Sequence, residues 1–215
     1  MTDYGLILVA YLLGSIPFGL LFPKIYGVPD IRKHGSGNVG ATNVMRTVGV
    51  VPGLLVMAGD IGKGVAAVLV AGQFGNGVIA VQTLYLLAGL AAIIGHIFPI
   101  FLKFKGGKGV NTALGVMLML MPAAAMSGLA AFIVTVLISR YISLGSIIAS
   151  LVFFGVVLLG YLTDFMIVPL LYLIVAAIVP VLIIVAHRSN IKRLVSGTEN
   201  RFSFHSQHKE AGSNV

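Results

Sequence analysis

The sequence predicts an all-α integral membrane protein with about seven transmembrane helices. Of its 215 residues, 58% are hydrophobic and only 9% are charged, and its mean hydropathy is +1.05. Soluble domains carry about 25% charged residues, so the bilayer is the natural solvent for this chain. A transmembrane helix needs roughly 20 apolar residues, which leaves no room for a separate soluble domain. We expect one membrane-embedded domain over residues 1–202 and a polar, disordered tail over residues 203–215.

Seven apolar stretches are the candidate helices. The fourth is short and ends against Pro122, so it is expected to be tilted, kinked or incomplete. A five-helix count, in which the second and fourth stretches are partly re-entrant, is the main alternative. The first stretch lacks a basic leading region and a small-residue cleavage site, so we interpret it as a retained span. The stretches run at about residues 4–23, 50–73, 78–101, 110–121, 123–139, 144–162 and 165–186.

The basic residues gather on one side of this seven-helix topology. With seven spans, thirteen of the 14 Lys and Arg residues fall in segments that share one face, and the turns on the other face have none. The positive-inside rule makes the basic face cytoplasmic. The N-terminus is then outside, the C-terminus is cytoplasmic, and the polar motifs form a single site at the cytoplasmic face. The thirteen are Lys24, Arg32, Lys33, Arg46, Lys103, Lys105, Lys108, Arg140, Arg188, Lys192, Arg193, Arg201 and Lys209.

The remaining basic residue, Lys63, lies within the second stretch, three positions after Asp60. This spacing places both side chains on one helix face, where they can pair and so lower the cost of burial. A purely structural pair is one interpretation. A supporting role at a functional site is the other, because ionisable residues inside a membrane usually have a function.

The first polar motif, residues 30–49, contains Gly35, Gly37 and Gly40 as G-x-G-x-x-G. A dinucleotide fingerprint would need a preceding strand in a βαβ unit, whereas this motif leads into a membrane span. We expect instead a nest of backbone N–H groups that holds a phosphate, with Ser36 or Asn38 capping a helix that runs to about Arg46. A flexible interfacial turn is the simpler alternative.

The second motif, residues 95–115, contains Lys105, Gly106, Gly107, Lys108 and Gly109 before a helix that begins near Val110. It is not a Walker A loop, because the position for the first glycine is Leu102 and no Ser or Thr follows Lys108. The pattern predicts a second anion cradle. Two such cradles on one face suit a reaction between two phosphorylated substrates, and nucleic acid, which requires an extended basic surface with stacking aromatics, is not expected.

Two further polar segments lie on the same face. The turn at residues 140–146 is basic and carries hydroxyl groups, although an interfacial Tyr with a snorkelling Arg explains it equally well. After the last span, His187 and Asn190 stand at i and i+3 and can face one site, while a basic tail that binds lipid headgroups is the alternative.

Several familiar chemistries are absent from the sequence. It has no cysteine and five scattered histidines, so we expect no thiolate nucleophile, no metal site and no cofactor. The His-x4-Asp pair typical of thioester-dependent glycerolipid acyltransferases is also missing.

At these motifs the chain resembles the bacterial acyl-phosphate:glycerol-3-phosphate acyltransferases, the PlsY family. The matching stretches are GSIPFG, GSGNVGATNVMR, GDIGKG, GHIFPIFLKFKGGKGV, SLGS and HRSNIKRLVSGTENRF, which together extend from about residue 11 to 202. The resemblance implies transfer of an acyl group from acyl phosphate to the 1-hydroxyl of glycerol-3-phosphate, which yields lysophosphatidic acid and phosphate. It further implies a bacterial inner-membrane location, contact with membrane lipid and no obligate protein partner. A transporter or channel for a phosphorylated anion is the alternative.

The resemblance also assigns roles to residues of this chain. It implies that one phosphate site uses the first motif and the other uses the second, and that the acyl chain lies in a groove between helices. The implied catalytic residues are Ser36, Arg46, Lys105, His187 and Asn190. The implied substrate-binding residues are Gly37, Asn38, Thr42, Asn43, Gly106, Gly107, Lys108, Gly109, Thr112 and Ser146, with Asp60, Lys63 and Glu199 in support.

A helix C-terminus stabilises a charged imidazolium, so His187 is expected to bind substrate better than it would act as a base. The hypothesis is that the phosphate of the donor takes the proton from the attacking hydroxyl, while His187 and Asn190 position the acceptor.

The charge pattern gives a topology that can be tested with reporter fusions. Fusions near the exterior turns, at Asn76 and Thr163, should report the outside because no basic residue retains those turns in the cytoplasm. An exterior signal at any basic segment would contradict a single-face site. Cytoplasmic signals are expected after Lys33, Lys105, Arg140 and Arg193.

Overall fold

The computed structural model describes residues 2–163 and 166–202, and the described residues are helical almost throughout. The expected tail at 203–215 lies outside them. In chain order the elements are α1 (Asp3–Gly14), α2 (Phe18–Ile25), η1 (Ile31–Lys33), α3 (Ala41–Thr47), α4 (Val50–Phe74), α5 (Val81–Ile97), η2 (Ile100–Leu102), α6 (Val110–Leu120), α7 (Pro122–Ser139), α8 (Ile142–Thr163), α9 (Leu170–Ala186) and α10 (Arg188–Val195).

All seven apolar stretches are helical, but they differ in length. In the described part of the chain, five segments are long and apolar enough to cross a membrane, or six if α9 and α10, bent by 62°, count as one span. Helix α6 has 11 residues and is therefore about 16 Å long, roughly half the hydrocarbon thickness. The fourth stretch is thus short, as expected. The second stretch is the continuous 25-residue helix α4, so the re-entrant alternative for it is wrong.

The first span is broken at Pro17, between α1 and α2. Proline cannot donate a backbone hydrogen bond and disrupts a helix interior, so carbonyl groups at the break need other donors. The carbonyl of Ile16 accepts a hydrogen bond from Lys63 Nζ at 3.0 Å. A side chain of α4 therefore stabilises the break in the first span.

The chain reverses between α6 and α7 at a single residue. Met121 is the C-cap of α6 and also the N-cap of α7, and Pro122 follows at the first position of α7. Proline is tolerated there because the first N–H groups of a helix have no intrahelical partner. The reversal makes α6 a half-length helix that packs against α7 within the bundle.

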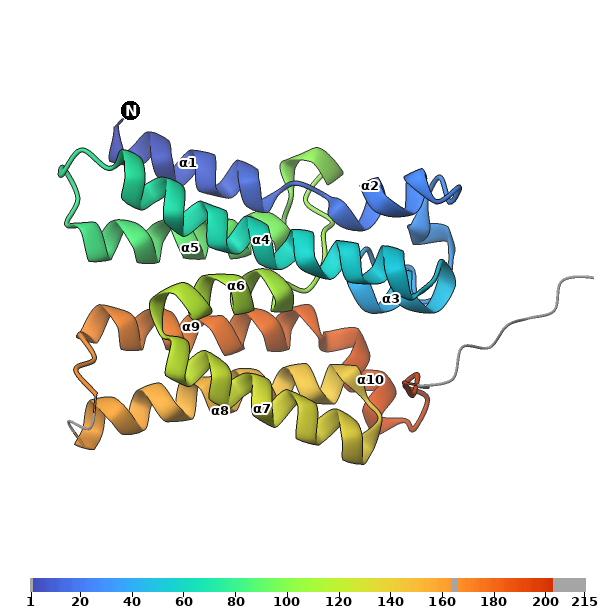
Figure 1. Cartoon of the computed structure of the whole chain (residues 1–215). Helices are drawn as coiled ribbons and strands as arrows, with labels where there is room; N and C mark the ends of the chain where they lie inside the picture. Colours follow the sequence, from blue (N-terminus) through green and yellow to red (C-terminus); the bar gives the residue numbers. More distant parts are fainter. Residues whose placement is uncertain (1, 164–165, 203–215) are drawn as a thin grey trace, which may run out of the picture.

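Figure 1 shows how these helices are arranged. Helices α1, α4 and α5 lie side by side, α7, α8 and α9 form a second group, and α6 lies between the two groups. The short helices α2, α3 and α10 gather at the same end of the molecule, on the right of the view, and α1 begins at the opposite end. The first motif and the segment after the last span therefore share one end of the bundle.

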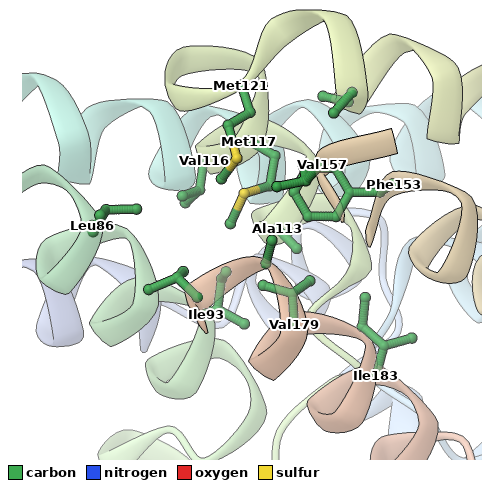
Figure 2. Packing of buried hydrophobic residues seen from close by; sticks show 14 of the residues in the cluster. Leu86, Ile93, Ala113, Val116, Met117, Met121, Phe153, Val157, Val179 and Ile183 are labelled. Atoms are coloured by element: carbon green, nitrogen blue, oxygen red, sulfur yellow. The ribbon is translucent and has the colours of Figure 1, made fainter. Parts of the chain in front are cut away.

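The largest buried cluster is centred on α6. Ala113, Val116 and Met117 of this helix contact Ile93 of α5 and Val179 of α9, with further residues of α7 and α8 around them. Figure 2 shows these side chains converging from several helices on the space beside Met117. The half-length helix is therefore fixed on most sides by apolar packing.

Glycines allow α4 and α6 to approach closely. A Cβ atom at Gly64 would lie 2.4 Å from the Thr112 carbonyl oxygen, and one at Gly115 would lie 2.2 Å from the Ile61 carbonyl oxygen. Small residues at helix crossings are common in membranes because backbones gain dispersion contacts when they pack closely. This crossing holds the first turn of α6 against α4.

Substituting Gly64 by alanine should destabilise the protein, because the added methyl group would overlap backbone atoms of α6. Overpacking costs about 1–3 kcal/mol, so the thermal unfolding temperature in detergent should fall. Gly62→Ala is the matched control, since a Cβ atom there meets nothing within 4 Å. Equal unfolding temperatures for the two variants would contradict the close crossing.

Candidate active site

A cavity of about 360 Å³ opens among α3, α4, α6, α7, α8, α9 and α10. It brings together polar groups that are up to 164 positions apart in sequence, from Ser36 to Asn200. The predicted site residues that line it are Ser36, Asn38, Thr42, Asn43, Arg46, Asp60, Lys108, Gly109, Ser146, His187, Asn190 and Glu199.

Six predicted residues are not among those that line this cavity. Lys105 is exposed and lies outside it, and Gly37 belongs to the outer part of the first loop. Gly106, Gly107 and Lys63 line a small neighbouring cavity that also touches Asp60. Thr112 is fully buried, and its Oγ1 lies 3.1 Å from His96 Nδ1. The structure therefore places Lys108, and not Lys105, as the cavity-lining lysine of the second motif.

Asn43 organises the first loop. Its Nδ2 donates to the carbonyl groups of His34 at 3.1 Å and Asn38 at 2.9 Å, and its Oδ1 accepts from the Ser36 N–H at 2.9 Å. Asn43 is 2% exposed, and these three bonds use most of the hydrogen-bonding capacity of its side chain. Asn43 therefore shapes the loop and has little capacity left for a phosphate.

Three N–H groups of the expected nest in this loop are already used by internal hydrogen bonds. The N–H of Gly37 donates to the His34 carbonyl and that of Gly40 to Asn38 Oδ1, in addition to the Ser36 bond to Asn43. Helix α3 does run past Arg46, but its cap is Gly40 and no side chain caps it. The expected capping by Ser36 or Asn38 is therefore wrong. The phosphate nest stays a prediction, which can use only the N–H groups of the loop that these bonds leave.

The second motif departs from the expected cradle in the same way. The N–H groups of Gly106 and Gly107 donate to the carbonyls of Ile97 and His96, each at 3.1 Å, where they satisfy the end of α5. Gly109 has φ of 80° and caps α6, a left-handed conformation that favours glycine. The groups of this motif that remain available to an anion are therefore Lys108 and the first N–H groups of α6, which lack intrahelical partners.

The ammonium group of Lys108 has a lowered pKa. Burial lowers the pKa of its ammonium group to about 8, Glu199 opposes this effect, and the positive charges of Arg193 and Arg46 add to it. A bound phosphate would supply the missing negative charge and favour the protonated form. Lys108 is therefore suited to bind an anion at neutral pH.

Glu199 connects α8 and α10 at the edge of the cavity. Its Oε1 accepts from Asn190 Nδ2 at 2.6 Å and from Ser143 Oγ at 2.8 Å, and its Oε2 accepts from Arg193 Nε at 2.7 Å. Partial burial raises the pKa of this carboxyl group, but the three hydrogen bonds outweigh that effect and lower the pKa below its usual value. Glu199 is therefore a charged support for Asn190.

This support fixes the direction of the Asn190 amide. With Nδ2 committed to Glu199, Oδ1 is buried and accepts no hydrogen bond from any group in residues 2–163 and 166–202. A buried acceptor without a donor costs about 1–3 kcal/mol. Because Asn190 lines the cavity, a substrate hydroxyl or amide could supply the donor.

His187 lies at the bend between α9 and α10 and is 2% exposed. Its Nδ1 lies 2.8 Å from the carbonyl oxygen of Ile183, so we assign the proton to Nδ1, which leaves Nε2 as an acceptor in the neutral ring. The expected charged imidazolium does not fit this environment, because burial next to Lys108 disfavours a second positive charge. His187 and Asn190 both therefore offer acceptor atoms in one cavity.

The other part of the cavity is apolar. Its walls come from α6 to α9 and reach into the cluster of Figure 2, where Met117, Phe153, Val179 and Ile183 are shared by both. Such a surface has no hydrogen-bonding role and is favourable for a hydrocarbon chain. The cavity thus has a cationic region and an apolar region side by side.

Sequence reasoning missed several residues of this site. His96 lines the cavity and lies 3.4 Å from Asp60 Oδ1 through its Nδ1; it stands within the GHIFPIF stretch, which was a signal that it belongs to a polar motif. Ser143 and Arg193, which hold Glu199, lie in the matching stretches SLGS and HRSNIKRLVSGTENRF, but nothing singled them out within these stretches. Among the described residues, no group of three or more His, Cys, Asp or Glu could hold a metal ion.

Comparison with known proteins shows which family this chain belongs to. A family model described as glycerol-3-phosphate acyltransferase matches residues 4–197. The chain belongs to the glycerol-3-phosphate acyltransferase family. This membership confirms the resemblance drawn from the motifs, and it makes the chain similar to enzymes rather than to transporters.

Curated members of the glycerol-3-phosphate acyltransferase family are similar over almost their whole length. The protein of Trichlorobacter lovleyi is 48% identical over 193 residues, which are 90% of this chain and 94% of that protein. The protein of Geobacter sulfurreducens is 48% identical over 202 residues, which are 94% of this chain and 98% of that protein.

Solved structures of this family share the fold. The crystal structure of PlsY, an integral membrane glycerol 3-phosphate acyltransferase, in its glycerol 3-phosphate form has a TM-score of 0.82 and 42% identity, and the match covers 94% of this chain and 96% of that one. The lysophosphatidic acid form has a TM-score of 0.80 and 41% identity, with 94% and 95% covered. With these neighbours and its apolar helices, the chain is a multi-pass membrane protein.

The role of Asn43 predicts a specific effect of Asn43→Asp. The substitution keeps the shape but turns the two donated bonds into repulsive contacts between a carboxylate and carbonyl oxygens, so the loop should loosen. Trypsin cleavage after Lys33, beside the loop, should become at least about tenfold faster if the two lost bonds destabilise the loop by about 1.4 kcal/mol or more.

Asn38→Asp is the matched control for this measurement. The Asn38 side chain only accepts a bond, from the Gly40 N–H, and a carboxylate keeps that acceptor. If both variants are cleaved at the rate of the unmodified protein, Asn43 does not hold the loop.

Proposed function

We propose that this protein transfers an acyl group from acyl phosphate to the 1-hydroxyl of glycerol-3-phosphate, and so forms lysophosphatidic acid and phosphate. The observation that carries the proposal is the single cavity that places Lys108 and Arg46 next to an apolar channel between α6, α7, α8 and α9. An acyl phosphate has the same two parts, an anionic head and a hydrocarbon chain. Membership of the glycerol-3-phosphate acyltransferase family supports the second substrate.

The cationic part of the cavity suits two phosphate groups. Arg46 on α3 and Lys108 before α6 come from different segments, and the first turn of α6 adds N–H groups that lack intrahelical partners. Hydrogen bonds from charged groups to phosphate contribute about 1.5–3 kcal/mol each. We propose Lys108 as the phosphate-binding lysine in place of Lys105.

The acceptor atoms of His187 and Asn190 suit the attacking hydroxyl. In the proposed step the hydroxyl oxygen attacks the acyl carbonyl carbon, the bond from that carbon to the phosphate oxygen breaks, and the hydroxyl proton ends on the departing phosphate. His187 Nε2 and Asn190 Oδ1 orient the hydroxyl through its hydrogen and its neighbouring hydroxyl group. Orientation of this kind can account for several kcal/mol of the barrier, without a protein base.

The orientation in the membrane follows from the charges. We propose that the end of the bundle that carries α2, α3 and α10 faces the cytoplasm of a bacterial cell, with the N-terminus outside and the C-terminus inside, in the inner membrane. We propose that glycerol-3-phosphate then enters from the cytoplasm and acyl phosphate from the membrane.

The proposal is tested by measuring phosphate release from acyl phosphate by the purified protein in lipid vesicles. Release should require glycerol-3-phosphate and should match the lysophosphatidic acid formed. Uptake of glycerol-3-phosphate into vesicles without any acyl transfer would contradict the proposal and support a transporter.

The low pKa of Lys108 predicts how substrate binding varies with pH. In the free protein Lys108 loses its proton as pH rises through about 8, and only the protonated form attracts a phosphate. The KM of at least one phosphorylated substrate should therefore rise about tenfold between pH 7 and pH 9, since one pH unit above the pKa leaves about a tenth of the lysine charged. Initial rates across this range measure it.

Two variants complete this pH test. Lys108→Arg should abolish the rise, because a guanidinium stays charged, and Lys108→Ala should raise KM by about 10- to 100-fold at pH 7. Lys105→Ala should keep the wild-type profile because its side chain is outside the cavity. A flat profile in the unmodified protein would contradict the role of Lys108.

His187→Asn and His187→Gln test the roles in the chemical step. Both keep a hydrogen-bonding group and cannot act as a base, so appreciable turnover with a raised KM for glycerol-3-phosphate is expected. A fall in kcat of more than about 10⁴, the upper end for removal of a general base, with unchanged KM and an intact fold, would establish His187 as the base instead.

A further inference from the structure

A chain of buried polar side chains connects α4, α5 and α6 beside the cavity. Lys63 Nζ lies 2.7 Å from Asp60 Oδ1, and both side chains are 3% exposed. The same Asp60 oxygen lies 3.4 Å from His96 Nδ1, and this nitrogen is 3.1 Å from Thr112 Oγ1. Asp60 and His96 also line the cavity.

The position of His96 controls the glycine turn before Lys108. Its carbonyl accepts the N–H of Gly107 at 3.1 Å. Its ring is packed so closely against the turn that a Cβ atom on Gly107 would lie 2.1 Å from Nε2. The ring is therefore in close contact with the turn, and the residue after Gly107 is Lys108.

Thr112 extends the same control to α6. It lies in the first turn of that helix, it is 0% exposed, and its hydroxyl contacts the ring nitrogen that faces Asp60. The unpaired N–H groups at the start of α6 are thus held relative to the same imidazole. One carboxylate, through one ring, fixes both components of the proposed phosphate site.

The ion pair keeps the carboxylate fixed. Lys63 is itself held, because it donates to the Ile16 carbonyl at the break in the first span and lies 5.8 Å from the centre of the Phe18 ring. A buried ion pair with a purely structural role can often be replaced by apolar residues without loss of stability. The geometry here links the pair to an imidazole at the cavity wall instead.

From this geometry we infer that Asp60, His96 and Thr112 are positioning residues for phosphate binding, which act by holding Lys108 and the start of α6 in place. The inference rests on the proposed function for the identity of the phosphorylated substrate, but it concerns binding and not the chemical step. The sequence alone could not show these roles, because Asp60, His96, Thr112 and Lys108 are brought together by tertiary packing.

The substitutions that test the inference are nearly isosteric. Thr112→Val removes the hydroxyl and keeps the shape, and Asp60→Asn removes the charge. Each should weaken binding of glycerol-3-phosphate or inorganic phosphate to the purified protein about tenfold, as measured by calorimetry, and raise KM more than it lowers kcat. Thr112→Ser, which keeps the hydroxyl, should recover most of the lost affinity.

A double-mutant cycle with Lys108→Ala separates positioning from general damage to the fold. Because Thr112 and Asp60 are inferred to act through Lys108 as well as through the start of α6, their substitutions should weaken phosphate binding by clearly less than about tenfold when Lys108 is already alanine. Equal losses in both backgrounds, or unchanged phosphate affinity in Thr112→Val with a normal unfolding temperature, would overturn the inference. If Asp60→Asn fails to fold, the Thr112 cycle still decides the question.

Failure of the positioning inference can be distinguished from failure of the proposed acyl transfer. Phosphate binding is measured without acyl phosphate, so a protein that shows no acyl transfer would refute the function and leave the binding cycle interpretable. A protein that transfers acyl groups normally, with no coupling between Thr112 and Lys108, would refute only the inference.

Discussion

Burying the Asp60–Lys63 pair inside a membrane bundle requires that its remaining hydrogen-bonding positions be filled, and this requirement links most parts of the structure. Lys63 reaches the Ile16 carbonyl across the broken first span, at 3.0 Å, and Asp60 faces His96 of α5. Removing one partner of a buried pair costs about 3–5 kcal/mol, because the other is left charged and unpaired. The broken span, α4 and α5 are therefore held in one arrangement by a single pair, and the close glycine crossing holds α6 against the same part of α4.

The hydrogen bonds within this arrangement determine which groups remain available to bind substrate. Both glycine-rich loops use their own N–H groups to hold themselves together, the first through Asn43 and the second through the end of α5. Rigid loops then present a few side chains and the start of α6 to the cavity. A site built on fixed elements holds its groups close to one geometry, and here the cationic groups border an apolar channel that continues into the core of the bundle.

Local rules predicted the parts of this structure that depend on nearby residues. Composition identified the membrane class, the i, i+3 spacing identified the Asp60–Lys63 pair, and the break before Pro122 marked the short fourth helix. Long-range hydrogen bonds decided the rest. No local pattern shows that Gly106 and Gly107 donate to the end of α5, so the sequence could not show that these two N–H groups are unavailable to an anion. Lys105 and Lys108 are likewise equivalent in sequence, and only the direction of the turn after His96 places Lys108 at the cavity.

The central claim is that the cavity directs a glycerol hydroxyl to the acyl carbon of an acyl phosphate. Glycerol-3-phosphate that carries oxygen-18 in its 1-hydroxyl group tests this directly, with both products analysed by mass spectrometry. If the hydroxyl attacks the acyl carbon, the heavy oxygen must appear in the ester of lysophosphatidic acid and the released phosphate must carry none. Free fatty acid together with a glycerol that has gained a second phosphate through its labelled oxygen would show attack at phosphorus, and would contradict the account.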